Sequence, residues 1–211
     1  MKLSRFIPII FASILLLSLG VNIYFFISNR QKYTVTSVPD GDSIDLASGQ
    51  RIRLLGLDAP ERGRCMSVEA RSALEMMTKG RQVRLTDTVV DSYGRTLANV
   101  FVGNMNVNNE MVIRGLAKFH SGKNSQYDNI QPSHEEAKRE KRGIYSNLCL
   151  STDPTTPCTI KGNIRDGKKY YYPPACPQYK QVIIDKSFGD EWFCSTGEAT
   201  SAGFLKSPVC K

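Results

Sequence analysis

Alternation of apolar and polar side chains over residues 43–46, and again over residues 51–54, constrains the fold most strongly. This two-residue period is typical of strands with one buried face. The dipeptide Ser48-Gly49 between the two runs has the composition of a tight turn. The sequence therefore predicts an antiparallel hairpin that packs one face against a core.

Charged residues surround this hairpin. Asp42 stands at the start of the first strand and Arg53 inside the second, and Asp58 and Glu61 follow just past its end. Taken singly, each has an ordinary role in a turn or on a solvated surface. Brought to one rim, they supply two carboxylates for a hard cation, a third for proton transfer and a guanidinium for phosphate. These are the groups that phosphodiester hydrolysis needs.

Up to residue 150, the chain predicts five strands and about three helices. The strands are expected over residues 33–38, 43–46, 51–54, 81–85 and 95–102. The helices are expected over residues 66–79, 108–114 and 132–143, the last opened by a capping box from Ser133 to Glu136. Five strands with a helix after the third fit a small Greek-key barrel.

Three ordered motifs make the most specific signal in the chain. They are Asp40-Gly41-Asp42-Ser43, the run from Arg53 to Glu61, and Asp91-Ser92-Tyr93-Gly94-Arg95. With them, residues 33 to about 146 resemble the staphylococcal nuclease (thermonuclease) family. The resemblance implies a mainly β fold with α elements (α+β), built on a five-stranded barrel of the oligonucleotide/oligosaccharide-binding type, the OB-fold.

The resemblance also implies a metal site. It assigns Asp42 and Asp58 as calcium-ligating carboxylates, with the backbone carbonyl of Ala59 as the third protein ligand. Few charges and several waters around a hard cation give an oxygen site of modest affinity, which suits a compartment rich in calcium. Ca²⁺ is therefore the expected cofactor.

Catalytic roles follow from the same resemblance. Glu61 is expected to orient or deprotonate the attacking water, although a calcium-bound water could react without a strong base. Arg53 and Arg95 are expected to hold the scissile phosphate, and Tyr93 to contact a terminal phosphate. The implied activity is hydrolysis of DNA and RNA, single strands preferred, to products with 3′-phosphate ends.

Two departures from the family pattern bear on substrate choice. The loop from Glu61 to Glu69 is several residues shorter than in well-known members and contains Cys65. Phe119-His120-Ser121 stands where those members carry a nucleobase-stacking tyrosine. His120 and His134 fall in no metal or base motif, and both are expected on the surface.

Six cysteines without a Cys-x-x-Cys pair favour disulfides and an oxidising compartment. Cys65 and Cys149 are the only two outside the tail, and we expect them to pair. The tail cysteines allow three pairings, among which a Cys158–Cys176 bridge is preferred; the four are Cys158, Cys176, Cys194 and Cys210. Zinc held by these tail cysteines is the alternative.

A Pro/Thr-rich linker at residues 151–157 separates this tail, residues 158–211, from a nuclease-like domain over residues 31–150. The tail resembles a small Cys-rich module appended to several bacterial nucleases, and a module of this size needs disulfide stapling. A hairpin is expected around Asp166-Gly167. Its tyrosines 170–172 could stack on a single strand or simply pack.

The N-terminal segment, residues 1–30, contains an uncharged apolar run over residues 6–28 after Lys2 and Arg5. This length predicts an uncleaved signal anchor, that is, a transmembrane helix. A signal peptide cleaved near Ser18-Leu19-Gly20 is the alternative. With the cysteines, either version places the protein outside the cytoplasm, in the periplasm or at the cell surface, anchored or secreted.

Charge alone does not identify the function. The net charge is +8, but residues 1–30 contain three basic residues and no acid, which leaves +5 for the remainder. This excess is compatible with a polyanionic substrate without requiring one. The favoured function is a monomeric, calcium-dependent endonuclease without sugar specificity. The rivals are a nucleic-acid-binding or uptake protein on the same barrel without turnover, and a structural protein of the cell envelope.

Overall fold

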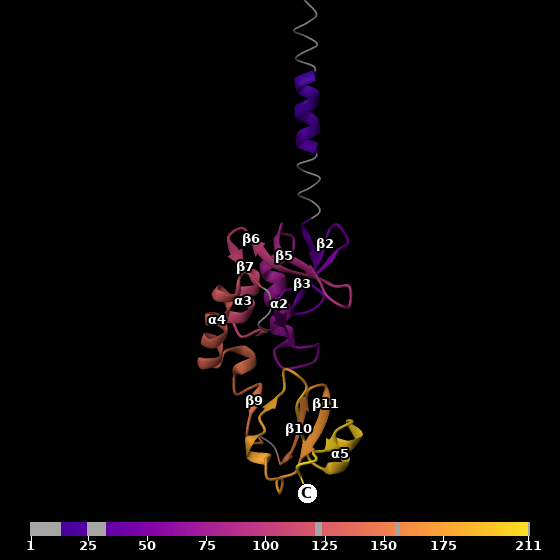
Figure 1. Cartoon of the computed structure of the whole chain (residues 1–211), viewed down its shortest axis with the longest axis vertical. Coiled ribbons are helices and arrows are strands. Elements are labelled where there is room, and N and C mark those ends of the chain that lie inside the picture. Colours follow the sequence, from indigo (N-terminus) through magenta and orange to yellow (C-terminus); the bar gives the residue numbers. More distant parts are fainter. Residues whose placement is uncertain (1–13, 25–32, 121–123, 155–156, 211) are drawn as a thin grey trace, which may run out of the picture.

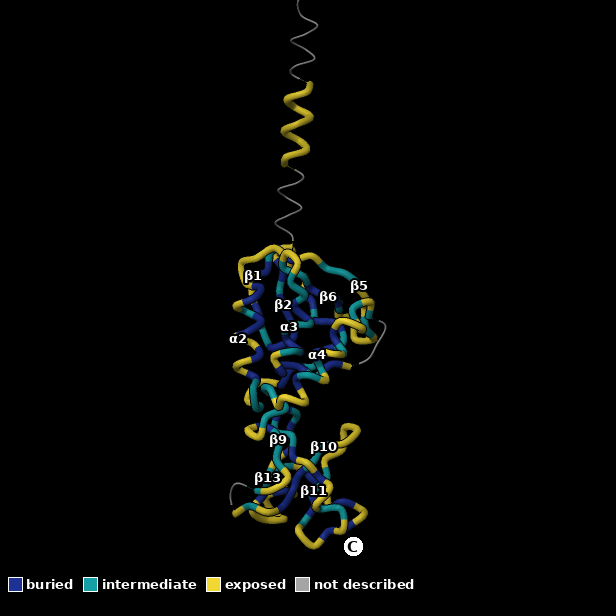
Figure 2. The backbone as a smooth tube through the Cα atoms, turned by 90° about the vertical axis from the view of Figure 1, so that its left-hand side faces the viewer, coloured by how far each residue is buried: buried dark blue, intermediate teal, exposed yellow. Residues whose placement is uncertain are grey.

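The computed structural model describes residues 14–24, 33–120, 124–154 and 157–210. Figure 1 shows two bodies stacked along the long axis, a larger one and, below it, a smaller one built by the C-terminal residues. Buried residues gather at the centre of each body (Figure 2). The buried apolar side chains form one large cluster in the first body and two small ones in the second. Each body therefore has its own core.

The larger body is built on a six-stranded sheet. Its strands are β1 (Val35–Ser37), β2 (Ser43–Leu46), β3 (Arg51–Leu54), β5 (Arg84–Val90), β6 (Thr96–Val102) and β7 (Met105–Asn106). The order is β1-β2-β3-β6-β5, and β7 pairs with β6. β2 and β3 form the predicted antiparallel hairpin, with Ser43 opposite Arg53. β3 and β6 run parallel.

The prediction of a closed five-stranded OB barrel is wrong, because the sheet is open. Its outer strands, β1 and β5, approach each other only through an isolated bridge between Thr34 and Gln82. Among the described residues, no ladder joins β1 to β5. A separate two-stranded sheet pairs β4 (Leu57–Asp58) with β8 (Lys118–Phe119). The fold is therefore mixed α+β with open sheets.

Helices α2 (Ser67–Thr78) and α3 (Val107–Ile113) lie close to their predicted positions. Helix α4 (Tyr127–Arg139) begins five residues before the predicted start at Pro132, which lies inside it. Ile130 in the early turns of α4 is fully buried. Packing of these turns into the core therefore outweighs the local capping signal at Ser133. A short 3₁₀ turn, η2 (Gly143–Tyr145), follows.

A buried amide joins the strands next to the charged motifs. Asn108 of α3 is fully buried. Its Oδ1 accepts a hydrogen bond from the N–H of Val100 at 2.9 Å, and its Nδ2 donates to the carbonyls of Leu55 at 3.1 Å and Ala98 at 3.4 Å. Buried backbone groups without partners are costly. This one side chain therefore fixes the chain just past β3 against β6.

The smaller body contains the predicted hairpin, β10 (Ile160–Arg165) and β11 (Lys168–Tyr172). Its turn residues Asp166 and Gly167 have φ of +51° and +74°, as a two-residue hairpin turn requires. The sheet order is β13-β10-β11-β14, where β13 is Glu191–Phe193 and β14 is Leu205–Lys206. The smaller body also contains helix α5 (Thr196–Ser201) and a 3₁₀ turn, η3 (Tyr179–Gln181). A separate two-stranded sheet pairs β9 (Leu150–Ser151) with β12 (Ile184–Asp185).

The tyrosines of the hairpin pack inward. Tyr172 is buried, and Tyr170 and Tyr171 are half-buried against the two small clusters. Of the two roles considered for these tyrosines, stacking on a single strand and packing in the core, their burial fits packing.

Three disulfides use all six cysteines. Cys65 pairs with Cys149, as expected. The preferred Cys158–Cys176 bridge is wrong, because the tail bridges are Cys158–Cys194 and Cys176–Cys210. The three bridges indicate an oxidising environment.

The two bodies meet through several contacts besides the Cys65–Cys149 bridge. Arg64 forms an ion pair with Glu191 at 2.8 Å, and Lys118 of β8 forms one with Asp185 of β12 at 2.7 Å. The backbone N–H of Cys65 donates to the carbonyl of Lys186 at 3.4 Å. The tail thus contacts both the loop after Glu61 and strand β8.

The N-terminal segment requires a correction. Residues 14–24 are helical, and the rest of the predicted segment 6–28 lies outside the described residues. In the part of the chain that the structure covers, no helix is long and apolar enough to cross a membrane. The predicted transmembrane helix is therefore not supported.

Candidate active site

Asp42 is placed by the tight turn that leads into β2. Its backbone N–H donates to Oδ1 of Asp40 at 3.2 Å. Gly41 lets this turn pack closely, since a Cβ there would lie 2.7 Å from the Cβ of Ala59 and 2.8 Å from that of Ala70 in α2. Only glycine fits this approach without displacing its neighbours. The Asp-Gly-Asp sequence thus seats Asp42 against the chain after β4.

The Asp42 carboxylate is buried and fully engaged. Oδ1 accepts hydrogen bonds from Nη1 of Arg53 at 2.7 Å and from Oγ of Ser43 at 3.0 Å, and Oδ2 accepts one from the N–H of Ala59 at 3.1 Å. Burial raises the pKa of Asp42 from 3.8 to about 6, although the Arg53 charge and the Ala59 N–H oppose this rise. A buried carboxylate with a raised pKa is typical of functional sites.

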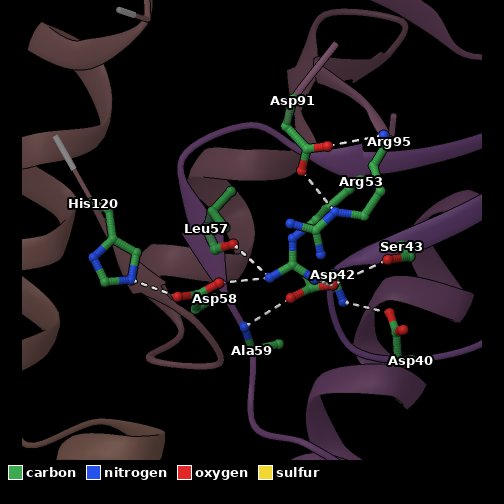
Figure 3. A network of polar contacts seen from close by, with 10 residues as sticks. All are labelled: Asp40, Asp42, Ser43, Arg53, Leu57, Asp58, Ala59, Asp91, Arg95 and His120. Atoms are coloured by element: carbon green, nitrogen blue, oxygen red, sulfur yellow. Dashed lines mark hydrogen bonds and ion pairs between the residues drawn. The ribbon is translucent and has the colours of Figure 1, made fainter. Parts of the chain in front are cut away.

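Arg53 joins Asp42 to Asp58, as Figure 3 shows. Its Nη2 lies 2.5 Å from Oδ1 of Asp58 and also donates to the carbonyl of Leu57 at 3.4 Å. The other oxygen of Asp58, Oδ2, lies 2.8 Å from Nε2 of His120. Asp58 is half-exposed, whereas Arg53 is largely covered. A chain of four charged or polar side chains therefore runs from Asp42 to His120.

Arg95 is held by the first residue of its own motif. Oδ2 of Asp91 accepts from Nε of Arg95 at 2.7 Å, and Oδ1 accepts from the backbone N–H groups of Arg95 and Tyr93, both at 2.9 Å. The pKa of Asp91 is lowered, because these hydrogen bonds outweigh burial. Tyr93 is strongly exposed, and the Arg95 guanidinium carbon lies 5.2 Å from its ring centroid.

A cleft of 510 Å³ brings the three predicted catalytic residues together. Arg53, Glu61 and Arg95 all line it, beside Asp40 and Ser43. Arg53 links this cleft to Asp42 and Asp58. Glu61 itself is exposed. We call this hollow the central cleft. Two guanidinium groups and a carboxylate around one hollow can bind a phosphate and a water molecule together.

Comparisons with known proteins agree with this geometry. Residues 51–147 match the protein family described as Staphylococcal nuclease homologue. A protein named Micrococcal nuclease from Shigella flexneri is 33% identical over 126 residues, which cover 54% of this chain and 72% of that protein. The chain belongs to the staphylococcal nuclease homologue family.

Two further relatives match this chain over a similar number of residues. A Thermonuclease from Staphylococcus hyicus is 31% identical over 133 residues, covering 57% of this chain and 79% of that protein. An Uncharacterized endonuclease from Escherichia coli O157:H7 is 34% identical over 128 residues, covering 58% and 80%. The prediction of a nuclease-type hydrolase is confirmed at the level of the family. The family match includes Arg53, Asp58, Glu61 and Arg95, and Asp42 precedes it.

The donor set at this nuclease site fits a hard divalent cation in its chemistry. The two carboxylates of Asp42 and Asp58 contact the same guanidinium, and the carbonyl of Ala59 follows Asp58 directly. All three donors are oxygens, which Ca²⁺ and Mg²⁺ prefer. Among the described residues, no group of three His, Cys, Asp or Glu side chains could hold a metal. Waters and a backbone carbonyl would therefore have to complete the shell.

Two residues of this candidate site were not predicted from the sequence. Asp91 stands in a recognised motif, and its four-residue spacing from Arg95 with opposite charge was the available signal. His120 was expected only as a surface residue. It reaches Asp58 because β4 pairs with β8, where Asp58 lies opposite Lys118, and the N–H of His120 donates to the carbonyl of Gly56 at 2.8 Å. No local pattern predicts this pairing.

Proposed function

We propose that the protein is a calcium-dependent endonuclease that hydrolyses phosphodiester bonds of DNA and RNA, without sugar specificity, and leaves 3′-phosphate ends. The observation that carries this proposal is the central cleft, where Arg53, Arg95 and Glu61 meet beside two paired carboxylates. Family membership supports the reaction class.

In this proposal, Asp42, Asp58 and the carbonyl of Ala59 hold the cation. Their all-oxygen chemistry suits Ca²⁺, and the oxidising environment indicated by the disulfides suits a protein of the periplasm or cell surface, where calcium is plentiful. When bound, the cation supplies Lewis-acid polarisation of a phosphate oxygen.

The two arginines bind the scissile phosphate. Guanidinium groups offer paired N–H donors that match phosphate oxygens, and in a partly closed cleft they stabilise the charge that builds in the transition state. Tyr93, exposed beside Arg95, contacts a neighbouring terminal phosphate. Contacts made to phosphates rather than to base edges leave the site indifferent to sequence.

Glu61 orients a water molecule and accepts its proton. The water oxygen bonds to phosphorus as the bond from phosphorus to the 5′-oxygen breaks. The 5′-oxygen takes up a proton to become a hydroxyl group, and the phosphate stays on the 3′-oxygen. Both the new bond and the broken bond lie at the phosphorus that Arg53 and Arg95 hold.

We also propose the division into a nuclease domain over residues 31–150, a linker over 151–157 and a Cys-rich module over 158–211. The separate apolar clusters of the two bodies support it.

Digestion of labelled single-stranded DNA and RNA by the disulfide-intact full chain tests the proposal. We expect cleavage with Ca²⁺, loss of cleavage with a calcium chelator, and 3′-phosphate ends identified by their resistance to ligation until treated with phosphatase. Arg95→Ala should abolish cleavage. The matched control is Arg165→Ala, which alters an exposed arginine of the tail hairpin. Binding without cleavage by the unaltered protein would favour the binding or uptake function instead.

A further inference from the structure

We propose that a second cleft, lined by Tyr33, Arg84 and Phe101, binds nucleotides of the same strand that flank the scissile phosphate. We call it the flanking cleft. Its volume is 640 Å³, which lies in the range of ligand-binding clefts. This inference rests on the proposed function, since the ligand it names is the extended single-stranded substrate of the central cleft.

The two clefts adjoin at one residue. Gln50 lines both of them. Its Nε2 also donates to Oγ1 of Thr96 at 3.2 Å, and Thr96 lines the central cleft next to Arg95. A strand that leaves the central cleft past Gln50 therefore reaches the residues that line the flanking cleft.

The chemistry of the flanking cleft suits a nucleotide. The guanidinium carbon of Arg84 lies 4.2 Å from the ring centroid of Phe101, its partner across β5 and β6. Tyr33, two residues before β1, also lines this cleft and is 41% exposed. Bases stack on aromatic rings and on guanidinium planes, and guanidinium groups pair with phosphates.

The charge of Arg84 is available for a phosphate. In the part of the chain that the structure covers, no carboxylate forms an ion pair with Arg84. By contrast, the three arginines that line the central cleft each form an ion pair: Arg51 with Asp45, Arg53 with Asp42, and Arg95 with Asp91. An exposed arginine over a ring, without a carboxylate, leaves a positive charge facing the cleft.

A third hollow, of 520 Å³, meets the central cleft on its other side through Asp40 and Glu61. It is lined by these two acids and by Glu75, with Arg62 and Arg71 as the basic residues. Three carboxylates beside two guanidinium groups repel a polyanion more than the lining of the flanking cleft does. Charge therefore favours the flanking cleft for the strand.

The spacing sets a length for the substrate. Gln50 stands three residues before Arg53, which is about 10 Å along an extended strand. A fully stacked strand advances ~3.4 Å per nucleotide and an extended strand advances more, so at most about three nucleotides separate the scissile phosphate from the entrance of the flanking cleft. Dinucleotides cannot reach it, whereas a dodecamer can.

A length series of oligothymidylates, from the dimer to the dodecamer, tests the inference. We measure kcat/KM of the full chain, of Arg84→Ala and of the matched control Arg165→Ala at each length. Longer oligonucleotides contain more cleavable bonds. Because the variants are compared on the same oligonucleotide, this number is the same for each protein and does not affect their ratio. We expect Arg84→Ala to lose about tenfold on the dodecamer, in the range of one stacking contact, and nothing on the dimer. Its salt dependence on the dodecamer should fall by about one unit of slope.

Tyr33→Ala serves as the second variant and should show the same length dependence, and circular dichroism shows that each variant is folded. Equal losses by Arg84→Ala on all lengths, or no loss on the dodecamer, would overturn the inference. If the unaltered protein cleaves nothing, the proposed function fails. Fluorescence anisotropy with the labelled dimer and dodecamer then decides the flanking cleft separately. Weaker binding of the dodecamer by Arg84→Ala supports the cleft, and unchanged binding refutes it.

Discussion

The disulfide between Cys65 and Cys149 is expected to serve both stability and catalysis, whereas the Cys176–Cys210 bridge serves stability alone. Cys65 lies four residues after Glu61, and its partner Cys149 precedes β9. We therefore compare Cys65→Ala/Cys149→Ala with Cys176→Ala/Cys210→Ala. The two double variants remove the same chemical bond at different distances from the central cleft.

Loop-closure entropy gives the size of the effect. The first bridge closes 84 residues and the second 34. The corresponding upper limits on the loss of unfolding free energy at 25 °C are about 4.6 and about 3.8 kcal/mol. The stability losses are thus comparable. Catalysis should differ, because releasing the loop after Glu61 displaces this carboxylate, and displacement of a catalytic group by about 1 Å costs on the order of a hundredfold in rate.

Urea unfolding followed by circular dichroism, and by the fluorescence of Trp192, the single tryptophan of the chain, measures both losses. The rate kcat is then measured with Ca²⁺ at a temperature where both variants are folded. We expect at least a tenfold lower kcat only for Cys65→Ala/Cys149→Ala. Equal kcat values for the two variants would refute the coupling of this bridge to Glu61. A larger stability loss for Cys176→Ala/Cys210→Ala would refute the loop-closure argument.

Three further predictions concern folding. Asn108→Ala should lose about 3 kcal/mol in urea unfolding, since the N–H of Val100 and the carbonyl of Leu55 lose their buried partner. Gly41→Ala should lose about 1–3 kcal/mol through overpacking and weaken calcium binding measured by calorimetry. His134→Gln should flatten the dependence of the melting temperature on pH below 6.5. Burial lowers the pKa of His134 from 6.5, so the unfolded chain takes up the proton first, and stability is lost as pH falls.

Each of these predictions has a control. For Asn108 it is Asn109→Ala, because Oδ1 of Asn109 has no hydrogen-bond partner in the described residues; an equal loss would contradict the role given to the buried amide. For Gly41 it is Gly197→Ala, where the nearest atom would lie 3.7 Å from the new Cβ; a neutral Gly41→Ala would sink the packing argument. For His134, a pH profile unchanged by the substitution would show that another group titrates.

The sequence predicts the parts of the fold that are encoded locally. The hairpin of β2 and β3 appears in the alternation of four residues on each side of a turn. The tail hairpin appears in Asp166-Gly167, because few dipeptides accept positive φ at both positions. Arg53, Asp58 and Glu61 lie within nine residues, so their convergence follows from one short segment.

Features that depend on distant pairing could not be predicted. Cys158 meets Cys194 because Ile160 of β10 lies opposite Phe193 of β13. This register places the residues just outside the ladder side by side, and nothing near either cysteine encodes it. The open edge between β1 and β5 is equally non-local, since it depends on how two strands 49 residues apart at their starts approach each other.

Arg53 and Arg95 differ in how many of their guanidinium nitrogens already have hydrogen-bond partners. In Arg53, both terminal nitrogens are committed, one to Asp42 at 2.7 Å and the other to Asp58 at 2.5 Å. In Arg95, Asp91 engages Nε, and within the described chain its terminal nitrogens make no hydrogen bond. An incoming phosphate can therefore pair with Arg95 at once, whereas it reaches Arg53 only as a carboxylate contact lengthens. Asp42 and Asp58 are also the residues proposed to hold the cation. A cation bound to these two carboxylates would weaken their ion pairs with Arg53 and so release its guanidinium. Under the proposed function, phosphate binding by Arg53 would thus depend on the proposed metal site, and binding by Arg95 would be independent of it.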